Sequence, residues 1–221
     1  MIRISLFGLL GLLLSLTACG DSQKLFSIGG STYKIPSDYL VMAPSSFDSA
    51  ELDSDVGMVA LSFSHDRNFS DYVGDNAWLP KSPITAILYS REGTELTGFS
   101  SSLSNLVGFS IEDKHVVEFE KNYRVFKGDT RISWQTFPKL QTRVGNDEIK
   151  AKWMAECIPL GGMKGSDQSR ESMDIPTSCK INVEYRNAIL SLTTSEKNLV
   201  NNAEEIVKLV LQRMDEWRVS F

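Results

Sequence analysis

The spacing of apolar residues changes near residue 195, and this change constrains the fold more than any other feature of the chain. Before it, apolar and polar residues mostly alternate, which is typical of strands that bury one face. After it, apolar residues recur three and four positions apart, as in an amphipathic helix. The chain has 221 residues, of which 42% are apolar, and this is enough for one sizeable core. The sequence therefore predicts an α+β domain, a mostly antiparallel sheet built of hairpins with a C-terminal amphipathic helix packed on it.

Alternating segments separated by turn residues predict the hairpins of this sheet. Residues 26–28 and 33–35 flank Gly29-Gly30-Ser31-Thr32, in which the glycines accept a positive φ. One long strand is predicted over 149–157, because apolar residues occupy every second position there. The other predicted strand segments are 59–63, 84–89, 116–119, 123–126, 140–144, 181–185 and 190–194.

The helix is predicted from a stripe of apolar residues, with Ser195 as its N-cap. The stripe consists of Leu199, Ala203, Ile206, Val207, Val210, Met214 and Trp217. A helix that lies on a membrane is the alternative, but such a helix usually has a basic polar face. The polar face here is not basic, because it carries both acidic and basic residues: Glu204, Lys208, Gln212 and Glu216. Packing against the sheet is therefore favoured.

The N-terminal segment has the features of an export signal. Arg3 precedes an apolar run over 6–16, which at about 11 residues suits a signal core and is too short to span a bilayer. The run ends in Leu16-Thr17-Ala18-Cys19, with a small residue directly before the cysteine. This segment resembles bacterial lipoprotein signal peptides of the type II class, in which such a tetrapeptide is the lipobox. An ordinary signal peptide with an incidental cysteine is the alternative.

The resemblance implies that residues 1–18 are removed and that Cys19 carries fatty acyl chains such as palmitate. Residues 19–24 would then be the lipidated cysteine and a short tether, and 25–221 a single globular domain. The expected location is the periplasm, with the lipid in the outer membrane. The inner membrane stays possible, because sorting signals at the positions of Gly20 and Asp21 differ between bacterial groups.

Cys157 and Cys179 remain as a pair once Cys19 is committed to lipid. An even number of cysteines in an exported protein favours a structural disulfide. Between them lies the polar, glycine-rich segment 161–169, and closing a loop of this size stabilises a fold by roughly 3 kcal/mol. A reactive thiol pair is the alternative, but the Cys-x-x-Cys spacing of such pairs is missing.

The sequence contains none of the common motifs of catalytic, metal or cofactor sites. His65 and His115 are its two histidines, and neither has a second ligand at metal-binding spacing. Glu118 and Glu120 are expected on one strand face, and a carboxylate pair for glycan hydrolysis stays open because its separation depends on the fold. The prediction is no catalytic residue, no metal and no cofactor. A net charge of −5 without a basic stripe also argues against a nucleic-acid partner.

Four acidic residues lie among serines ahead of the strand predicted at 59–63, namely Asp48, Glu51, Asp53 and Asp55. An EF-hand calcium loop is excluded, because the twelfth position counted from Asp53 is Ser64 rather than Glu. A solvated loop is one interpretation of this cluster. An acidic surface that meets a basic protein partner is the other.

The order of features resembles that of small lipoproteins that serve as immunity proteins for type VI secretion effectors. These features are the lipobox, the segment 26–36, the late pair Cys157 and Cys179, and the closing helix. The resemblance implies a non-enzymatic, protein-binding module that occludes a toxin arriving in the periplasm. An accessory lipoprotein of envelope assembly is one alternative, and an envelope enzyme or ligand carrier with an unrecognised site is another.

Overall fold

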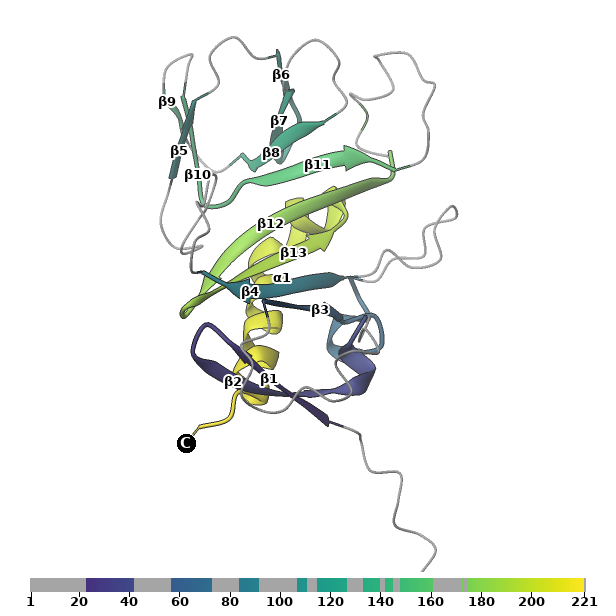
Figure 1. The fold of residues 1–221 in the computed structure, drawn as a ribbon. Helices are drawn as coiled ribbons and strands as arrows, with labels where there is room; N and C mark the ends of the chain where they lie inside the picture. Colours follow the sequence, from purple (N-terminus) through teal and green to yellow (C-terminus); the bar gives the residue numbers. More distant parts are fainter. Residues whose placement is uncertain are drawn as a thin grey trace, which may run out of the picture.

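The structure, a computed structural model, describes residues 23–41, 57–72, 84–91, 107–110, 115–126, 133–139, 142–144, 148–160, 172 and 175–220. Its largest element is an eight-stranded antiparallel sheet with the strand order β3-β4-β13-β12-β11-β8-β7-β6 (Figure 1). The strands are β3 (Met58–Ser62), β4 (Thr85–Ser90), β6 (His115–Glu118), β7 (Asn122–Phe126), β8 (Trp134–Pro138), β11 (Ala155–Pro159), β12 (Thr177–Tyr185) and β13 (Ala188–Thr194).

The N-terminal hairpin forms a separate two-stranded sheet from β1 (Gln23–Ile28) and β2 (Ser31–Pro36). Gln23 and Lys24, which the sequence assigned to the tether, are the first two residues of β1. Position 29 requires glycine for two reasons. Its φ is +57°, and an added Cβ would lie 2.5 Å from the carbonyl oxygen of Asn187. The hairpin therefore sits directly against the β12–β13 turn.

The prediction of one strand over 149–157 is wrong. This segment divides into β10 (Glu148–Ala151) and β11, which belong to different sheets. β10 pairs with β5 (Val107–Ser110) and β9 (Thr142–Val144), whereas β11 pairs with β8 and β12. Trp153 joins the main core, while Met154 joins a second core with Val125, Phe137 and Ala151. The alternation continues through the break because Ala151 is buried in the second core, while Trp153, Ala155 and Cys157 are buried in the main core.

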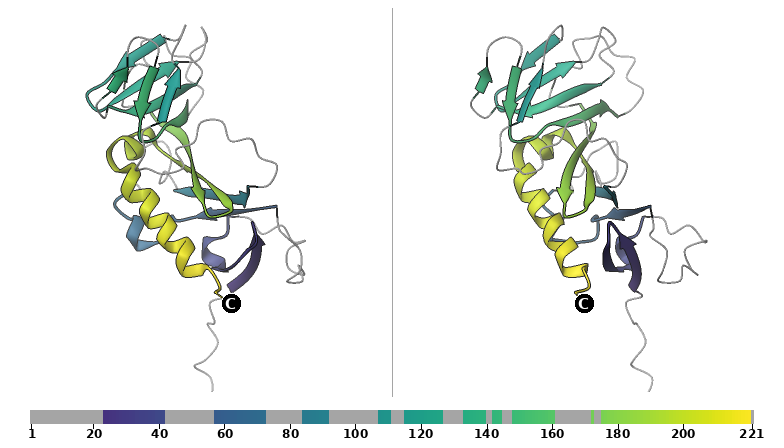
Figure 2. Two further views of the ribbon diagram at one scale, coloured as in Figure 1. Left: turned by 90° about the vertical axis from the view of Figure 1, so that its left-hand side faces the viewer. Right: turned by 60° about the vertical axis from the view of Figure 1, so that its left-hand side comes forward.

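The helix α1 (Glu196–Trp217) covers one face of the large sheet, as Figure 2 shows, and contacts β8, β12 and β13. Its predicted apolar stripe is buried in full, and the Ser195 side chain accepts a hydrogen bond from the backbone N–H of Asn198 at 3.2 Å. Near its C-terminal end, α1 packs on β2 and on the 3₁₀ helix η3 (Arg67–Phe69), while η1 (Ser37–Tyr39) follows β2. Backbone geometry is not helical at Asn202, where φ is −141°.

The predicted class is confirmed: the fold is α+β, with antiparallel sheets and one C-terminal helix among the described residues. The predicted N-terminal hairpin is present, and the segments predicted at 116–119 and 123–126 and at 181–185 and 190–194 pair as antiparallel hairpins. No helix in the described ranges combines the length and apolar composition needed to cross a bilayer.

Candidate functional site

Of the residues singled out in the sequence, Cys157 and Cys179 are brought together by the fold. They face each other on β11 and β12, with Cα atoms 4.0 Å apart, and form a disulfide. Both side chains are buried on the face that α1 covers. The lipobox with Cys19 and the acidic residues Asp48, Glu51, Asp53 and Asp55 lie outside the described residues.

Beside the disulfide, the carboxylate of Glu196 and the guanidinium of Arg124 form an ion pair that is removed from solvent. The Arg124 Nε donates to both carboxylate oxygens at 3.0 Å, and Nη2 donates to Oε2 at 2.5 Å. Asn122 and Trp134 also donate to Oε1, at 3.2 and 3.3 Å. Because Glu196 is the first residue of α1, these bonds hold the start of the helix to β7 and β8.

The surroundings of Arg124 further compensate the burial of its charge. The guanidinium lies 4.7 Å from the ring centroid of Trp134 and 4.8 Å from that of Phe119, within cation–π range. Its Nη1 donates to the carbonyl oxygen of Ser172 at 3.0 Å. Buried ion pairs persist only when such additional partners satisfy the remaining donors and acceptors.

One group of potential metal ligands occurs in the described parts of the chain, formed by Cys157, Cys179 and Glu196. The two sulfurs are bonded to each other, and both Glu196 oxygens accept hydrogen bonds from Arg124. In the oxidised protein, this group is therefore part of the packing at the helix start.

A second polar cluster lies at the other end of α1, where Asp66 meets Arg213 and Tyr39. The Arg213 Nε donates to Asp66 Oδ2 at 2.6 Å, and the Tyr39 hydroxyl donates to the same oxygen at 3.0 Å. Burial alone would raise the pKa of Asp66, but the hydrogen bonds from Arg213, the Asn68 N–H and Tyr39 outweigh it and lower that pKa. Burial and the bond to Asp66 raise the pKa of Tyr39 to about 12. The charged Asp66 thus fixes η3 and η1 to the helix.

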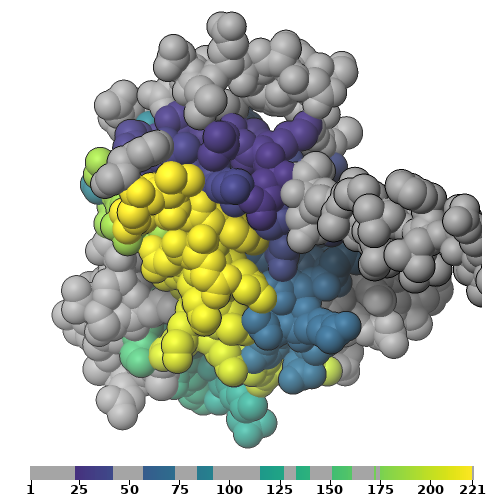
Figure 3. Space-filling model, turned by 90° about the horizontal axis from the view of Figure 1, so that it is seen from below, coloured from purple at the N-terminus to yellow at the C-terminus, as the bar shows by residue number. Residues whose placement is uncertain are grey.

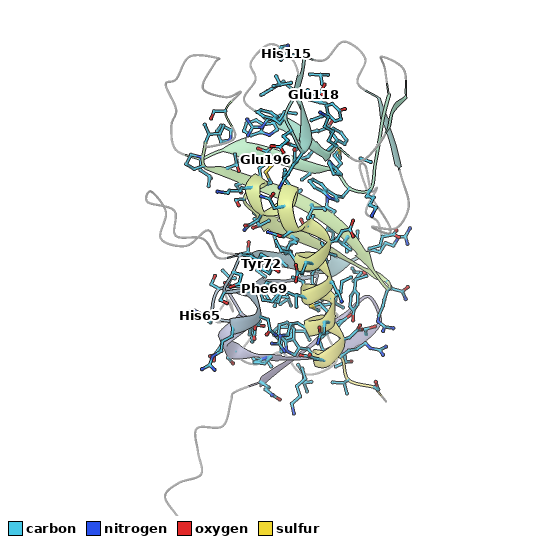
Figure 4. The ribbon with its side chains drawn as sticks, turned by 180° about the vertical axis from the view of Figure 1, so that it is seen from behind. His65, Phe69, Tyr72, His115, Glu118 and Glu196 are labelled. Atoms are coloured by element: carbon cyan, nitrogen blue, oxygen red, sulfur yellow. A yellow bond between two sulfur atoms is a disulfide. The ribbon has the colours of Figure 1, made fainter. Side chains whose placement is uncertain are left out.

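The two histidines are not brought together. Figure 4 shows His115 near Glu118 at one end of the molecule and His65 beside η3 towards the other, with Glu196 between them. Glu118 ends β6 and pairs with Lys139, whereas Glu120 lies beyond the strand end. The expectation that Glu118 and Glu120 share a strand face is therefore wrong.

The face of the large sheet that points away from α1, the outer face, carries the most unusual surface. Register places Met58, Ile87 and Ile158 on this face, together with Ser191, Asn182 and Lys180. Met58 is 61% exposed, Ile87 41% and Ile158 50%, and they are three of the five large apolar side chains exposed among the described residues. Met58 and Ile87 lie on the neighbouring strands β3 and β4, and Ile158 lies on β11, three strands further along the sheet. Exposed apolar groups on one face of a sheet can mark an interaction surface.

A groove of about 340 Å³ crosses the outer face beside Ile158. Its lining residues are Ser133, Trp134, Glu156, Cys157, Ile158, Ser178, Lys180 and Thr193. Glu156 and Lys180 are directly opposite each other on β11 and β12, so the groove carries both charges next to an apolar side chain. Such a mixture suits a protein surface better than a small apolar ligand.

A second hollow, of about 490 Å³, lies between α1 near Asn202 and the ends of β7 and β8. Two of its polar lining residues bond to each other, since Lys121 donates to Asn201 at 2.9 Å, and the lining residue Lys139 forms an ion pair with Glu118 outside the hollow. These partners bind the rim of the hollow together.

Sequence reasoning missed the Arg124–Glu196 pair and the outer face. The signal for the pair was a single charged residue among apolar ones at 123–126, followed much later by an acidic residue directly after a helix cap. The signal for the outer face was an apolar residue at positions that alternation assigns to solvent, as at Ile158. No family model, curated protein or solved structure matches this chain.

Proposed function

We propose that this chain is a lipid-anchored periplasmic protein that binds another protein, without catalysis, through the outer face of its large sheet. The observation that carries the proposal is that Met58, Ile87 and Ile158 are exposed on that face, and that Ile158 lines a groove together with the facing charges of Glu156 and Lys180. The buried charged groups Glu196, Arg124 and Asp66 are engaged in holding α1 to the rest of the fold. They are therefore assigned to structure rather than to a reaction.

The partner that fits this surface has an apolar centre ringed by basic side chains. The chain is acidic overall, with a net charge of −5, and β3 begins three residues after Asp55, the last member of the predicted acidic loop. The carboxylates of an acidic protein would speed the encounter with a basic partner, while the exposed apolar side chains would provide the affinity. A toxin that the anchored domain occludes has this chemistry, and we propose immunity as the biological role.

The test measures binding to one identified partner. The protein encoded next to this chain, or the main protein recovered by crosslinking in the envelope, is purified and titrated against the full-length, acylated protein. Ile158→Glu and Ile87→Glu should each weaken binding about tenfold or more, because a charge would be buried in the apolar contact.

The matched control is Leu25→Glu, since Leu25 is also 42% exposed but lies on the separate β1–β2 sheet. This variant should bind normally. Unchanged affinity in both outer-face variants would reject the outer face as the binding surface. Recovery of only a small metabolite would reject protein binding altogether. A toxin as partner would support immunity, whereas a resident assembly protein would reject it.

A further inference from the structure

The β1–β2 hairpin has one buried and one exposed face. Phe26, Ile28, Tyr33 and Ile35 belong to the main core. The opposite face presents Gln23, Leu25, Ser27, Thr32, Lys34 and Pro36. Leu25 is 42% exposed and lies directly across from the exposed Lys34. Among these six residues Lys34 is the one charged side chain, and Leu25 and Pro36 are the apolar ones, so the face has a positive charge in a chain with 28 acidic residues.

The hairpin is held firmly to the C-terminal end of α1. Tyr33 forms an antiparallel bridge with Arg218, and the Val219 N–H donates to the Thr32 carbonyl oxygen at 2.9 Å. Figure 3 shows the hairpin and the helix side by side at this end of the molecule. Two acidic residues of the helix precede Arg218. Glu216 accepts a hydrogen bond from Arg213, and Asp215 accepts hydrogen bonds from Tyr185 and Arg186. The exposed face is therefore a preorganised surface, with the carboxylates of Asp215 and Glu216 paired and the exposed Asp38 two residues beyond Pro36.

Chain length places this face close to the proposed anchor. Three residues, Gly20, Asp21 and Ser22, separate Cys19 from Gln23. Four Cα–Cα steps cover at most about 14 Å, even when the backbone is fully extended. An acylated cysteine lies at the headgroup level, so β1 would begin within the reach of the lipid headgroups. This step rests on the lipid anchor of the proposed function.

We propose that the exposed hairpin face docks on the anionic headgroups of the leaflet that holds the acyl chains. Lys34 would contact lipid phosphates, and Leu25 would enter the interface between headgroups and acyl chains. A single lysine and a single leucine would not bind a membrane alone. The tether makes the contact intramolecular, so a weak interaction is enough to orient the domain.

The consequence is a defined orientation of the whole domain. β1–β2 and the C-terminus lie at one end of the molecule, and β6 with the small sheet β5-β10-β9 lies at the other (Figure 1). A docked hairpin would direct β6 away from the membrane. The outer face would then stand to the side, where a periplasmic partner can reach it.

The test places an environment-sensitive fluorophore on the full-length, acylated protein in vesicles. In Leu25→Cys, the introduced thiol is available for labelling, because Cys19 carries lipid and Cys157 is bonded to Cys179. Ile158→Cys on the outer face is the matched control. On vesicles of phosphatidylethanolamine with phosphatidylglycerol, the probe at position 25 should shift to the blue and be quenched by nitroxide lipids. The probe at position 158 should report water.

Charge reversal tests the electrostatic part of the contact. When the labelled Leu25→Cys protein also carries Lys34→Glu, the fraction of molecules whose probe is in contact with lipid should fall about fivefold or more. This is the effect expected for the loss of one lysine near an anionic surface. Equal quenching at positions 25 and 158, or equal quenching on pure phosphatidylcholine, would overturn the proposal. Flotation of the protein with vesicles while the probe at position 25 reports water would overturn docking and leave the anchor intact. A protein that does not float would overturn both.

Discussion

At the scale of single residues, Arg124 is the group whose removal should cost most. Arg124→Met leaves the Glu196 carboxylate buried without its cationic partner, and breaking such a pair typically costs about 3–5 kcal/mol. The free energy of unfolding, measured in urea, should therefore fall by this amount. The double variant Arg124→Met with Glu196→Leu should recover part of the loss, because no uncompensated charge then stays in the core.

The control is the exposed pair between Lys152 and Glu204, whose Nζ–Oε1 distance is 2.9 Å. Lys152→Met should lower the free energy of unfolding by less than about 1 kcal/mol, because solvent screens this pair. Equal losses for the two methionine variants would show that burial does not set the value of the Arg124 pair.

Asp66 gives the fold a dependence on pH. Its pKa is lowered in the folded state, so the unfolded chain binds its proton more tightly. The stabilisation by charged Asp66 is thus complete above its unfolded pKa, near 3.9, and is lost as the pH falls through the lower folded value. Asp66→Asn should lower the free energy of unfolding at pH 7 by about 1–3 kcal/mol, and the difference from the natural protein should shrink below about pH 4. A difference that stays constant down to pH 2.5 would contradict this assignment.

At the scale of elements, Gly29 and Gly30 should respond differently to the same change. Both have positive φ, so alanine costs roughly 1 kcal/mol of backbone strain at either position. At Gly29 the added Cβ would also meet the Asn187 carbonyl oxygen at 2.5 Å, whereas at Gly30 nothing lies within 4 Å. Gly29→Ala should therefore lower the thermal midpoint clearly more than Gly30→Ala. Equal midpoints would mean that the hairpin can move away from the β12–β13 turn at little cost.

The disulfide joins two neighbouring strands, and its two cysteines are 22 positions apart in the sequence. Replacing both Cys157 and Cys179 by serine should lower the free energy of unfolding by roughly 3 kcal/mol, chiefly because the unfolded chain gains freedom. Peptide mapping without reductant should recover the two cysteine peptides as one linked species. Two thiols that alkylate freely in the folded protein would contradict the bond.

The local elements were predictable because short-range rules determine them. The β12–β13 hairpin follows from alternation around a two-residue turn, and the start of α1 follows from the Ser195 cap. The break between β10 and β11 was not predictable, because Trp153 and Met154 enter different cores and alternation does not reveal which sheet a strand joins. The pairing of β4 with β13, about a hundred residues apart in sequence, also depends on the whole fold.

At the scale of the whole molecule, the candidate site depends on which faces the fold covers. The residues that meet Glu196 come from β7 and β8, and their sequence positions give no sign of this contact. The outer face is covered at Val125 and Phe137 by Ala151 and Met154, but is exposed at Ile87 and Ile158. Only the disulfide was predicted, because compartment and cysteine count were enough to suggest it.

The proposed anchor predicts where the whole protein resides in the cell. Cys19→Ser removes the one side chain that a lipobox acylates, and with it a membrane attachment worth about 0.8 kcal/mol for each buried CH₂ group. The variant should therefore remain unprocessed or move to the soluble periplasmic fraction. The double variant Cys157→Ser with Cys179→Ser removes two cysteines without touching the lipobox, so it should stay with the membrane. If Cys19→Ser also fractionates with the membrane at its mature size, the lipid does not hold this protein, and the orientation proposed for its hairpin loses its basis.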